Sequence, residues 1–225
     1  MERVLEKLSY RGPDGWAKWD AENILLGHRR LSIVDLSPAG SQPFVDSSRG
    51  LVITFNGEIY NYQEIRELLR AKGYTFHSQS DTEVILCAYD CFGEDFLTHF
   101  RGMFSFCLLD QRRGIVLLAR DPMGEKPLYY YLDQERFAFA SEIKAFHAFP
   151  EIPLDVDVES VKAFLSLQYI PDPHTSYKQI QRLPAGTWMR IDLHQWDVRQ
   201  YKYWRFDEKP ELKHFDPDEV ESLLA

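Results

Sequence analysis

The sequence predicts an antiparallel α+β sandwich with helices on its outer faces. Between residues 101 and 141, short apolar or aromatic segments follow one another, separated by polar turns such as the one from Asp110 to Gly114. Connections this short force antiparallel neighbours, because a parallel crossover needs about a dozen residues or more. Strands that are apolar on both sides need cover on both faces, and the helices that precede them can provide it.

Each element has its own sequence signal. Apolar residues at helical spacing mark the first helix, whereas the next two are marked by the capping residues Asn61 and Ser80 and by the closing glycines Gly73 and Gly93. The strands are apolar runs bounded by turn residues. The predicted elements are, in order, a helix over residues 1–8, a β-rich segment near 23–34, a strand over 51–55, helices over 61–72 and 82–92, strands over 103–110, 114–121, 127–132 and 136–141, a helix near 159–167 and a hairpin-like stretch over 186–204.

The composition is that of an ordinary globular protein with an acidic balance. The 225 residues carry 26 Lys and Arg against 35 Asp and Glu, a formal net charge of −9. Nucleic acid and anionic membrane are therefore not expected as partners. No apolar stretch approaches the roughly 18 residues that a membrane span needs. An odd number of cysteines without a secretory signal fits a reducing cytoplasm, which we predict as the location.

The stretch from Leu51 to Ile65, LVITFNGEIYNYQEI, contains the first candidate site. An Asn-Gly pair after an apolar run is a strong hairpin signal, but a capped helix follows it instead of a second strand. Asn56 and Gly57 at a strand end can present a side-chain amide and an unobstructed backbone N–H side by side. These are the two donors that an oxyanion hole requires. On this signal alone, a hairpin turn is the alternative.

Charged residues elsewhere in the chain offer partners for a small polar ligand. Arg29 and Arg30, at the end of an apolar strand, could hold a carboxylate with a bidentate fork, although a surface salt bridge is the simpler interpretation. Asp81 could recognise an ammonium group, but a negative charge at the start of a capped helix also has a structural explanation. Glu58 has no such explanation, because it directly follows the glycine at the strand end.

The sequence shows neither an evident nucleophile nor a metal site. Cys87 and Cys91 lie four residues apart on a helix and are interpreted as packing residues, and Cys107 lies inside an apolar strand, where we expect it to be buried and inert. The seven His residues show no metal-binding spacing, so we predict no metal. Asp155 and Asp157 are interpreted as a solvated face.

Seven motifs in a fixed order carry a family resemblance. They are YRGPDG at Tyr10, GHRRLSIVDLS at Gly27, QPF at Gln42, FNGEIYNYQEIRELL at Phe55, SDTEVIL at Ser80, RGMFSF at Arg101 and ARDPMGEKPLYY at Ala119. Together they resemble the glutaminase domain of glutamine-hydrolysing asparagine synthetase, a class II glutamine amidotransferase. The run RLSIVDLS favours this branch over the amidotransferases that make aminosugars or phosphoribosylamine.

The resemblance implies a fold and a division of the chain. The fold would be that of an N-terminal-nucleophile hydrolase, an αββα sandwich of antiparallel sheets, expected in this chain to lack its first strand. Residues 1–150 would form the amidotransferase core, incomplete at its amino end, and residues 151–210 a sheet extension and connector. Residues 211–225 would begin the linker to a synthetase domain outside this sequence, where ATP and Mg are expected; no cofactor is expected in this chain.

The resemblance also implies roles for the candidate site residues. Arg30 would bind the α-carboxylate of L-glutamine, and Glu58 and Asp81 would bind its α-ammonium group. The backbone of Leu31, Ser32, Ile33 and Val34 would line the pocket. Asn56 and Gly57 would form the oxyanion hole. A zwitterionic amino acid needs partners of both signs at a fixed separation, so these separate signals become one recognition set.

The departure from the family concerns the nucleophile. In that family the mature chain begins with Cys, whose thiolate attacks the glutamine amide while its own α-amino group acts as the base. This sequence begins Met1-Glu2. We therefore expect a fragment, or a gene read from a late start, of an enzyme that passes ammonia from glutamine to ATP-activated aspartate. Residues 1–225 alone are expected to show no glutaminase activity.

Two alternatives remain open at this point. The chain could be a non-catalytic glutamine-binding or scaffold module of a degenerate paralogue, or it could belong to an amidotransferase that acts on peptide or antibiotic precursors. The expected partners are L-glutamine and the synthetase domain of the parent chain, with a homodimer in the parent.

Overall fold

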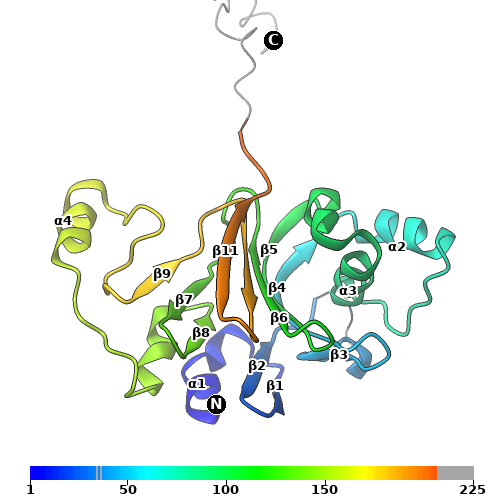
Figure 1. Ribbon diagram of the computed structural model, residues 1–225, viewed down its shortest axis with the longest axis horizontal. Coiled ribbons are helices and arrows are strands. Elements are labelled where there is room, and N and C mark those ends of the chain that lie inside the picture. Colours follow the sequence, from blue (N-terminus) through cyan, green and yellow to red (C-terminus); the bar gives the residue numbers. More distant parts are fainter. Residues whose placement is uncertain (34, 36, 207–225) are drawn as a thin grey trace, which may run out of the picture.

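The computed structural model describes residues 1–33, 35 and 37–206, and Figure 1 shows strands in the middle of the molecule with helices at its sides. The elements are α1 (Glu2–Lys7), η1 (Ser9–Arg11), β1 (Gly15–Ala21), β2 (Ile24–Arg30), η2 (Pro38–Gly40), β3 (Phe44–Asp46), β4 (Leu51–Ile59), α2 (Tyr62–Ala71), α3 (Asp81–Phe92), η3 (Gly93–His99), β5 (Gly102–Asp110), β6 (Ile115–Arg120), β7 (Tyr129–Leu132), β8 (Phe137–Ala140), η4 (Ile143–Ala148), α4 (Val158–Leu167), β9 (Ile180–Arg182), β10 (Thr187–Asp192) and β11 (Asp197–Lys202). The predicted fold class, α+β with antiparallel sheets, is confirmed. The predicted linker, residues 211–225, lies outside the described residues.

The larger sheet has six strands in the order β11-β10-β6-β5-β4-β3, and every neighbouring pair is antiparallel. β5 follows β4 along its whole length, from Leu51 to Ile59. β3 is short and pairs only with residues 51–53 of β4. The second half of β4 therefore has a strand neighbour on one side only.

Two smaller sheets lie on the other side of the molecule from α2 and α3 (Figure 1). One is the hairpin β1-β2, and the other has the order β8-β7-β9. Among the described strands, β2 pairs with β1 alone and β8 pairs with β7 alone. Each of these two strands thus has one edge without a strand partner.

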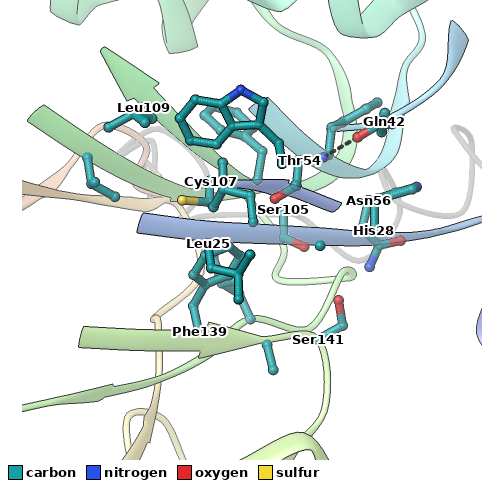
Figure 2. Close-up of a pocket in the computed structure, with 18 of the residues that line it drawn as sticks. Leu25, His28, Gln42, Thr54, Asn56, Ser105, Cys107, Leu109, Phe139 and Ser141 are labelled. Atoms are coloured by element: carbon teal, nitrogen blue, oxygen red, sulfur yellow. Dashed lines mark hydrogen bonds between the residues drawn. The ribbon is translucent and has the colours of Figure 1, made fainter. Parts of the chain in front are cut away.

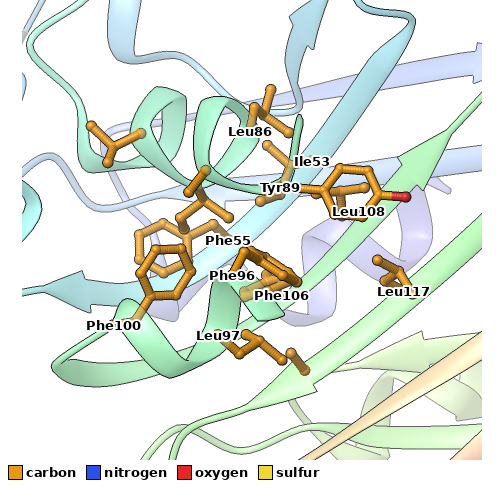
Figure 3. Packing of buried hydrophobic residues seen from close by; sticks show 14 of the residues in the cluster. Ile53, Phe55, Leu86, Tyr89, Phe96, Leu97, Phe100, Phe106, Leu108 and Leu117 are labelled. Carbon is orange, nitrogen blue, oxygen red and sulfur yellow. The ribbon is translucent and has the colours of Figure 1, made fainter. Parts of the chain in front are cut away.

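The large sheet is covered on both faces, and successive residues of its strands point to opposite faces. On one face Ile53, Phe55 and Phe106 pack with α3 and η3, as Figure 3 shows. On the other face Val52 and Leu118 pack towards β2 and β7. A third cluster joins α1 to β7, β8 and η4. This two-sided burial explains why the strands are continuous apolar runs in the sequence.

The helix ends agree with the predicted signals, with one exception. Ser80 caps α3 by accepting a hydrogen bond from Thr82 N at 3.1 Å, and Gly93 ends the same helix with φ of 60°. Asn61 makes no capping bond to α2. Its amide instead donates to His99 O at 2.9 Å and accepts from Arg101 N at 2.9 Å, which ties the start of α2 to the segment before β5.

Residues after 150 contribute strands to both layers. β9 pairs with β7, and β10 pairs with β6 in the six-stranded sheet. The predicted division at residue 150 stays a prediction. Asp157, interpreted as part of a solvated face, has a structural task as well, because its carboxylate caps α4 by accepting from Glu159 N at 3.2 Å and from Ser160 Oγ at 2.6 Å. Within the described ranges, no helix has the length and apolarity that a membrane crossing needs.

Candidate active site

A cavity of about 1210 Å³ lies between β2, β8 and the six-stranded sheet. Figure 2 shows Phe139 on one side of the view, Thr54 of β4 and Cys107 of β5 on the other, and Leu25 and His28 of β2 between them. All predicted site residues that the structure describes line this cavity, namely Arg30, Leu31, Ser32, Ile33, Asn56, Gly57, Glu58 and Asp81. The structure thus brings together segments that lie far apart in the sequence. Val34 lies outside the described residues.

The Asn-Gly pair lies inside strand β4, so the hairpin interpretation is wrong. β4 continues to Ile59, two residues beyond the pair. The side chains of Asn56 and Glu58 point to the face that carries the cavity, whereas Phe55 and Ile59 point into the core beneath α3. The strand therefore holds the site on one face while the hydrophobic core fixes its other face.

The amide nitrogen of Asn56 is buried and has no hydrogen-bond partner among the described residues. An unsatisfied buried donor costs roughly 1–3 kcal/mol, so such groups are rare in folded proteins. Asn56 lines the cavity, and an unpartnered donor of this kind is a group that a bound acceptor would satisfy.

The backbone N–H of Gly57 is also directed away from the sheet. Gly57 lies opposite Phe104 in the β4–β5 register. Phe104 uses its own backbone groups on the other side, because its N–H donates to Asp121 Oδ2 at 3.2 Å and its carbonyl accepts from Asp121 N at 2.8 Å. In an antiparallel pair that is not hydrogen-bonded, both residues turn their backbone groups outwards. The Gly57 N–H therefore points to the edge of β4 that β3 leaves uncovered.

Only glycine fits at position 57. Its φ is +144°, which side-chain-bearing residues rarely adopt. A Cβ there would overlap the carbonyl oxygen of Met103 and lie 2.7 Å from Phe104 Cα. The close approach of β5 thus requires a residue without a side chain.

Arg30 ends β2 at the cavity and is held by the loop that follows it. Its Nη2 donates to the carbonyl oxygens of Asp35 at 2.6 Å and Ser37 at 2.9 Å, and its Nη1 donates to Ser41 Oγ at 3.4 Å. No carboxylate lies within ion-pair distance of Arg30 in residues 1–33, 35 and 37–206, so the surface salt bridge is not formed. Its Nε and part of Nη1 remain for an anionic ligand.

Asp81 is buried at the first turn of α3, and Glu58 lies near it on β4. The Asp81 carboxylate accepts from Ile59 N at 3.0 Å through Oδ2 and from Ser80 Oγ at 3.4 Å through Oδ1. Burial raises the pKa of Asp81, hydrogen bonds from backbone N–H groups lower it, and the charge of Glu58 raises it. A cation placed between the two carboxylates would relieve this repulsion.

The loop after β2 lines the cavity with its backbone. Leu31 and Ile33 expose their side chains to solvent. The N–H of Ser32 donates to Asp14 Oδ2 at 2.8 Å, so this amide is already used within the protein. The loop is positioned by Gly12, where a Cβ would come within 2.6 Å of Arg30 N.

The thiol and the imidazole that line the cavity are both neutral near pH 7. Burial strongly raises the pKa of Cys107, which points into the cavity from β5 (Figure 2). Its predicted burial is confirmed. Burial lowers the pKa of His28 to about 4, and the positive charge of Arg30 acts in the same direction. No group of three or more His, Cys, Asp or Glu suited to a metal ion occurs in the described ranges.

The sequence interpretation missed three residues of this region. Asp121 is fully buried and accepts hydrogen bonds from four backbone N–H groups, those of Phe104, Met123, Glu125 and Lys126. Gln42 accepts from a backbone N–H of β4, and His28 lines the cavity. Asp121 and Gln42 lie in two of the seven motifs, ARDPMGEKPLYY and QPF, but only the structure assigns them contacts.

The antiparallel sheets of this α+β chain define its class by fold, that of the N-terminal-nucleophile amidotransferases. The chain belongs to the glutamine amidotransferase domain family, whose model matches residues 1–204.

Curated relatives agree with this assignment. Putative asparagine synthetase 2 (glutamine-hydrolysing) of Methanocaldococcus jannaschii is 36% identical over 231 residues, which cover 93% of this chain and 44% of that protein. Asparagine synthetase 1 (glutamine-hydrolysing) of Bacillus subtilis is 37% identical over 191 residues, which cover 85% of this chain and 30% of that protein. The chain thus spans less than half the length of these curated relatives.

A solved structure supports the fold. The glutamine phosphoribosylpyrophosphate amidotransferase from Bacillus subtilis, in complex with ADP and GMP, superposes with a TM-score of 0.57 at 20% sequence identity. The match covers 81% of this chain and 35% of that chain. At this level of identity the likeness concerns the fold alone.

Proposed function

We propose that this chain is the glutamine-binding glutaminase domain of an asparagine synthetase. Glutamine is hydrolysed to glutamate and ammonia, and a synthetase domain of the same protein uses the ammonia to amidate aspartate. The observation that carries the proposal is the pair of available donors, Asn56 Nδ2 and Gly57 N–H, in a cavity that Arg30 and Asp81 also line. The names of the relatives support the asparagine branch.

Recognition of glutamine rests on groups of both charges. The Arg30 guanidinium is oriented by the carbonyl oxygens of its loop and binds the α-carboxylate. Asp81 and Glu58 bind the α-ammonium group, whose charge offsets the repulsion between the two carboxylates. Glutamine enters with its side-chain amide towards β4.

The chemistry requires a thiolate that attacks the glutamine side-chain carbonyl. Attack converts the carbonyl oxygen into an oxyanion, and Asn56 Nδ2 and Gly57 N–H stabilise it. The α-amino group that took the thiol proton donates it to the amide nitrogen, so that collapse of this intermediate breaks the C–N bond, releases ammonia and leaves a thioester, which water hydrolyses to glutamate. The resemblance assigns the thiolate to an N-terminal cysteine.

Calorimetry with glutamine tests the recognition set. A charge-assisted hydrogen bond contributes roughly 1.5–3 kcal/mol, so Arg30→Ala should raise the Kd about 10- to 100-fold. Asp81→Asn removes the charge but keeps an oxygen for the N–H of Ile59, so it should weaken binding while the fold persists. Arg70→Ala is the matched control, because Arg70 is exposed and pairs with Glu67 on α2. An unchanged Kd in Arg30→Ala would exclude the carboxylate role.

Glutamate release separates turnover from binding. A polypeptide of residues 1–225 should release no glutamate above background, since it contains no N-terminal cysteine. The same residues preceded by a strand that begins with cysteine should hydrolyse glutamine. Comparable turnover by both polypeptides would contradict the assignment of the nucleophile. Glutamine binding without turnover in the extended chain would instead favour a non-catalytic module.

A further inference from the structure

The uncovered edge of β4 carries three outward N–H groups in a row. Outward groups alternate along a strand, and β5 takes the others; Tyr60 N, for example, donates to Arg101 O at 2.7 Å. The outward donors beyond β3 are therefore those of Phe55, Gly57 and Ile59. A neighbouring strand would use all three, and Gly57 would then have no donor left for a ligand.

Side chains take the place of that strand at the two outer positions. Phe55 N donates to Gln42 Oε1 at 2.6 Å, the contact drawn at Gln42 in Figure 2. Ile59 N donates to Asp81 Oδ2 at 3.0 Å. The middle donor, Gly57 N–H, has no hydrogen-bond acceptor in the part of the chain that the structure describes.

The two acceptors form one connected unit. Gln42 Nε2 donates to Thr82 Oγ1 at 3.4 Å, and Thr82 follows Asp81 in the first turn of α3. Ser80 caps this turn and is itself buried. The edge of β4 is thus fastened to the N-terminus of α3 on both sides of Gly57.

We infer that Gln42 is a positioning residue that, together with Asp81, holds the edge of β4 in place. Within the described residues, this leaves the Gly57 N–H as the single donor of that edge without an acceptor. The inference deepens the proposed function and rests on it for its catalytic meaning. An oxyanion donor must be fixed before the reaction, because it contributes only where charge develops in the transition state. Gln42 acts on this donor through its bond to Phe55 N, and it makes no hydrogen bond to Gly57 itself.

Amide hydrogen exchange followed by NMR tests the arrangement on residues 1–225. The Gly57 amide should exchange at least about tenfold faster than those of Phe55 and Ile59, because only the two flanking amides are hydrogen-bonded. In Gln42→Leu the Phe55 amide should lose about tenfold of its protection, the equivalent of about one buried hydrogen bond. Gln42→Glu keeps the accepting oxygen and should retain that protection. Gln63→Leu, at an exposed glutamine of α2, controls for the substitution itself.

Kinetics of the cysteine-led chain test the catalytic meaning. Gln42→Leu should lower kcat about tenfold with KM within about twofold, because the donor matters mainly in the transition state. Unaltered protection of Phe55 in Gln42→Leu, or a Gly57 amide as protected as its neighbours, would overturn the inference. A change in KM alone would also overturn it. If the cysteine-led chain shows no glutaminase activity at all, the proposed function fails, while the exchange pattern still decides whether Gln42 positions β4.

Discussion

Replacing Asn56 by leucine should stabilise the folded chain and weaken its site at the same time. The Asn56 amide nitrogen is buried without a partner among the described residues, a state that costs roughly 1–3 kcal/mol. Leucine has a similar size and needs no hydrogen bond. After allowing for lost hydration of the amide oxygen, we expect a gain of about 1 kcal/mol, which corresponds to a rise in Tm of about 2–4 °C for a chain of this length.

The matched control is the same substitution at Asn61. The Asn61 amide is satisfied on both sides, by His99 O and Arg101 N. Asn61→Leu should therefore destabilise the chain by about 1–2 kcal/mol, since two hydrogen bonds are lost. Thermal unfolding by circular dichroism measures both variants, and calorimetry with glutamine measures the site. A fall in Tm for Asn56→Leu of the size seen for Asn61→Leu would show that Asn56 Nδ2 is satisfied and that the reasoning is wrong.

Three further predictions concern single residues of the site region and of the neighbouring core. Gly57→Ala should lower the free energy of unfolding by about 2–5 kcal/mol in urea, because a Cβ would overlap β5 and the backbone would be strained. The control is Gly73→Ala, which has a positive φ but open space around it and should cost only about 1–2 kcal/mol. Equal costs would argue against the close approach of β5. His28 takes up a proton near pH 6.5 in the unfolded chain but only near pH 4 in the folded chain. Acidification from pH 7 to 5 should therefore lower the free energy of unfolding by at most about 2 kcal/mol through this residue. In His28→Gln, the same acidification should lower the free energy of unfolding by a correspondingly smaller amount. Because burial raises the pKa values of Cys87 and Cys107, a thiol reagent at neutral pH should label these residues only after unfolding; rapid labelling of native Cys107 would contradict its burial.

Much of the fold could be predicted because its signals are local. The capped start of α3, its closing glycine and the short turns between β5 and β8 lie within a few residues of the elements that they define. The Asp157 cap of α4 is equally local, yet its position in a Pro-flanked connector favoured the solvated interpretation. The contacts of Asn61 could not be predicted in the same way, since its partners lie about 40 residues further along the chain.

The candidate site was predictable in its members but not in its geometry. The motifs named Arg30, Asn56, Gly57 and Asp81, and all four line one cavity. The sequence carries no signal that Gln42 replaces a strand at the edge of β4, because the contact depends on where β3 ends. Sheet edges are set by the lengths of the paired strands, which no single segment encodes.

The position of the donor pair within a strand, and not in a turn, has a consequence for its precision. A turn would hold Asn56 and Gly57 by local backbone geometry alone, and loops are the more mobile parts of proteins. In β4 their neighbours Phe55 and Ile59 are anchored in the core beneath α3, and the register with β5 fixes Gly57 opposite Phe104. A site on a rigid element keeps its geometry more closely than one on a loop. The same core residues that stabilise the sheet therefore hold the two donors in register.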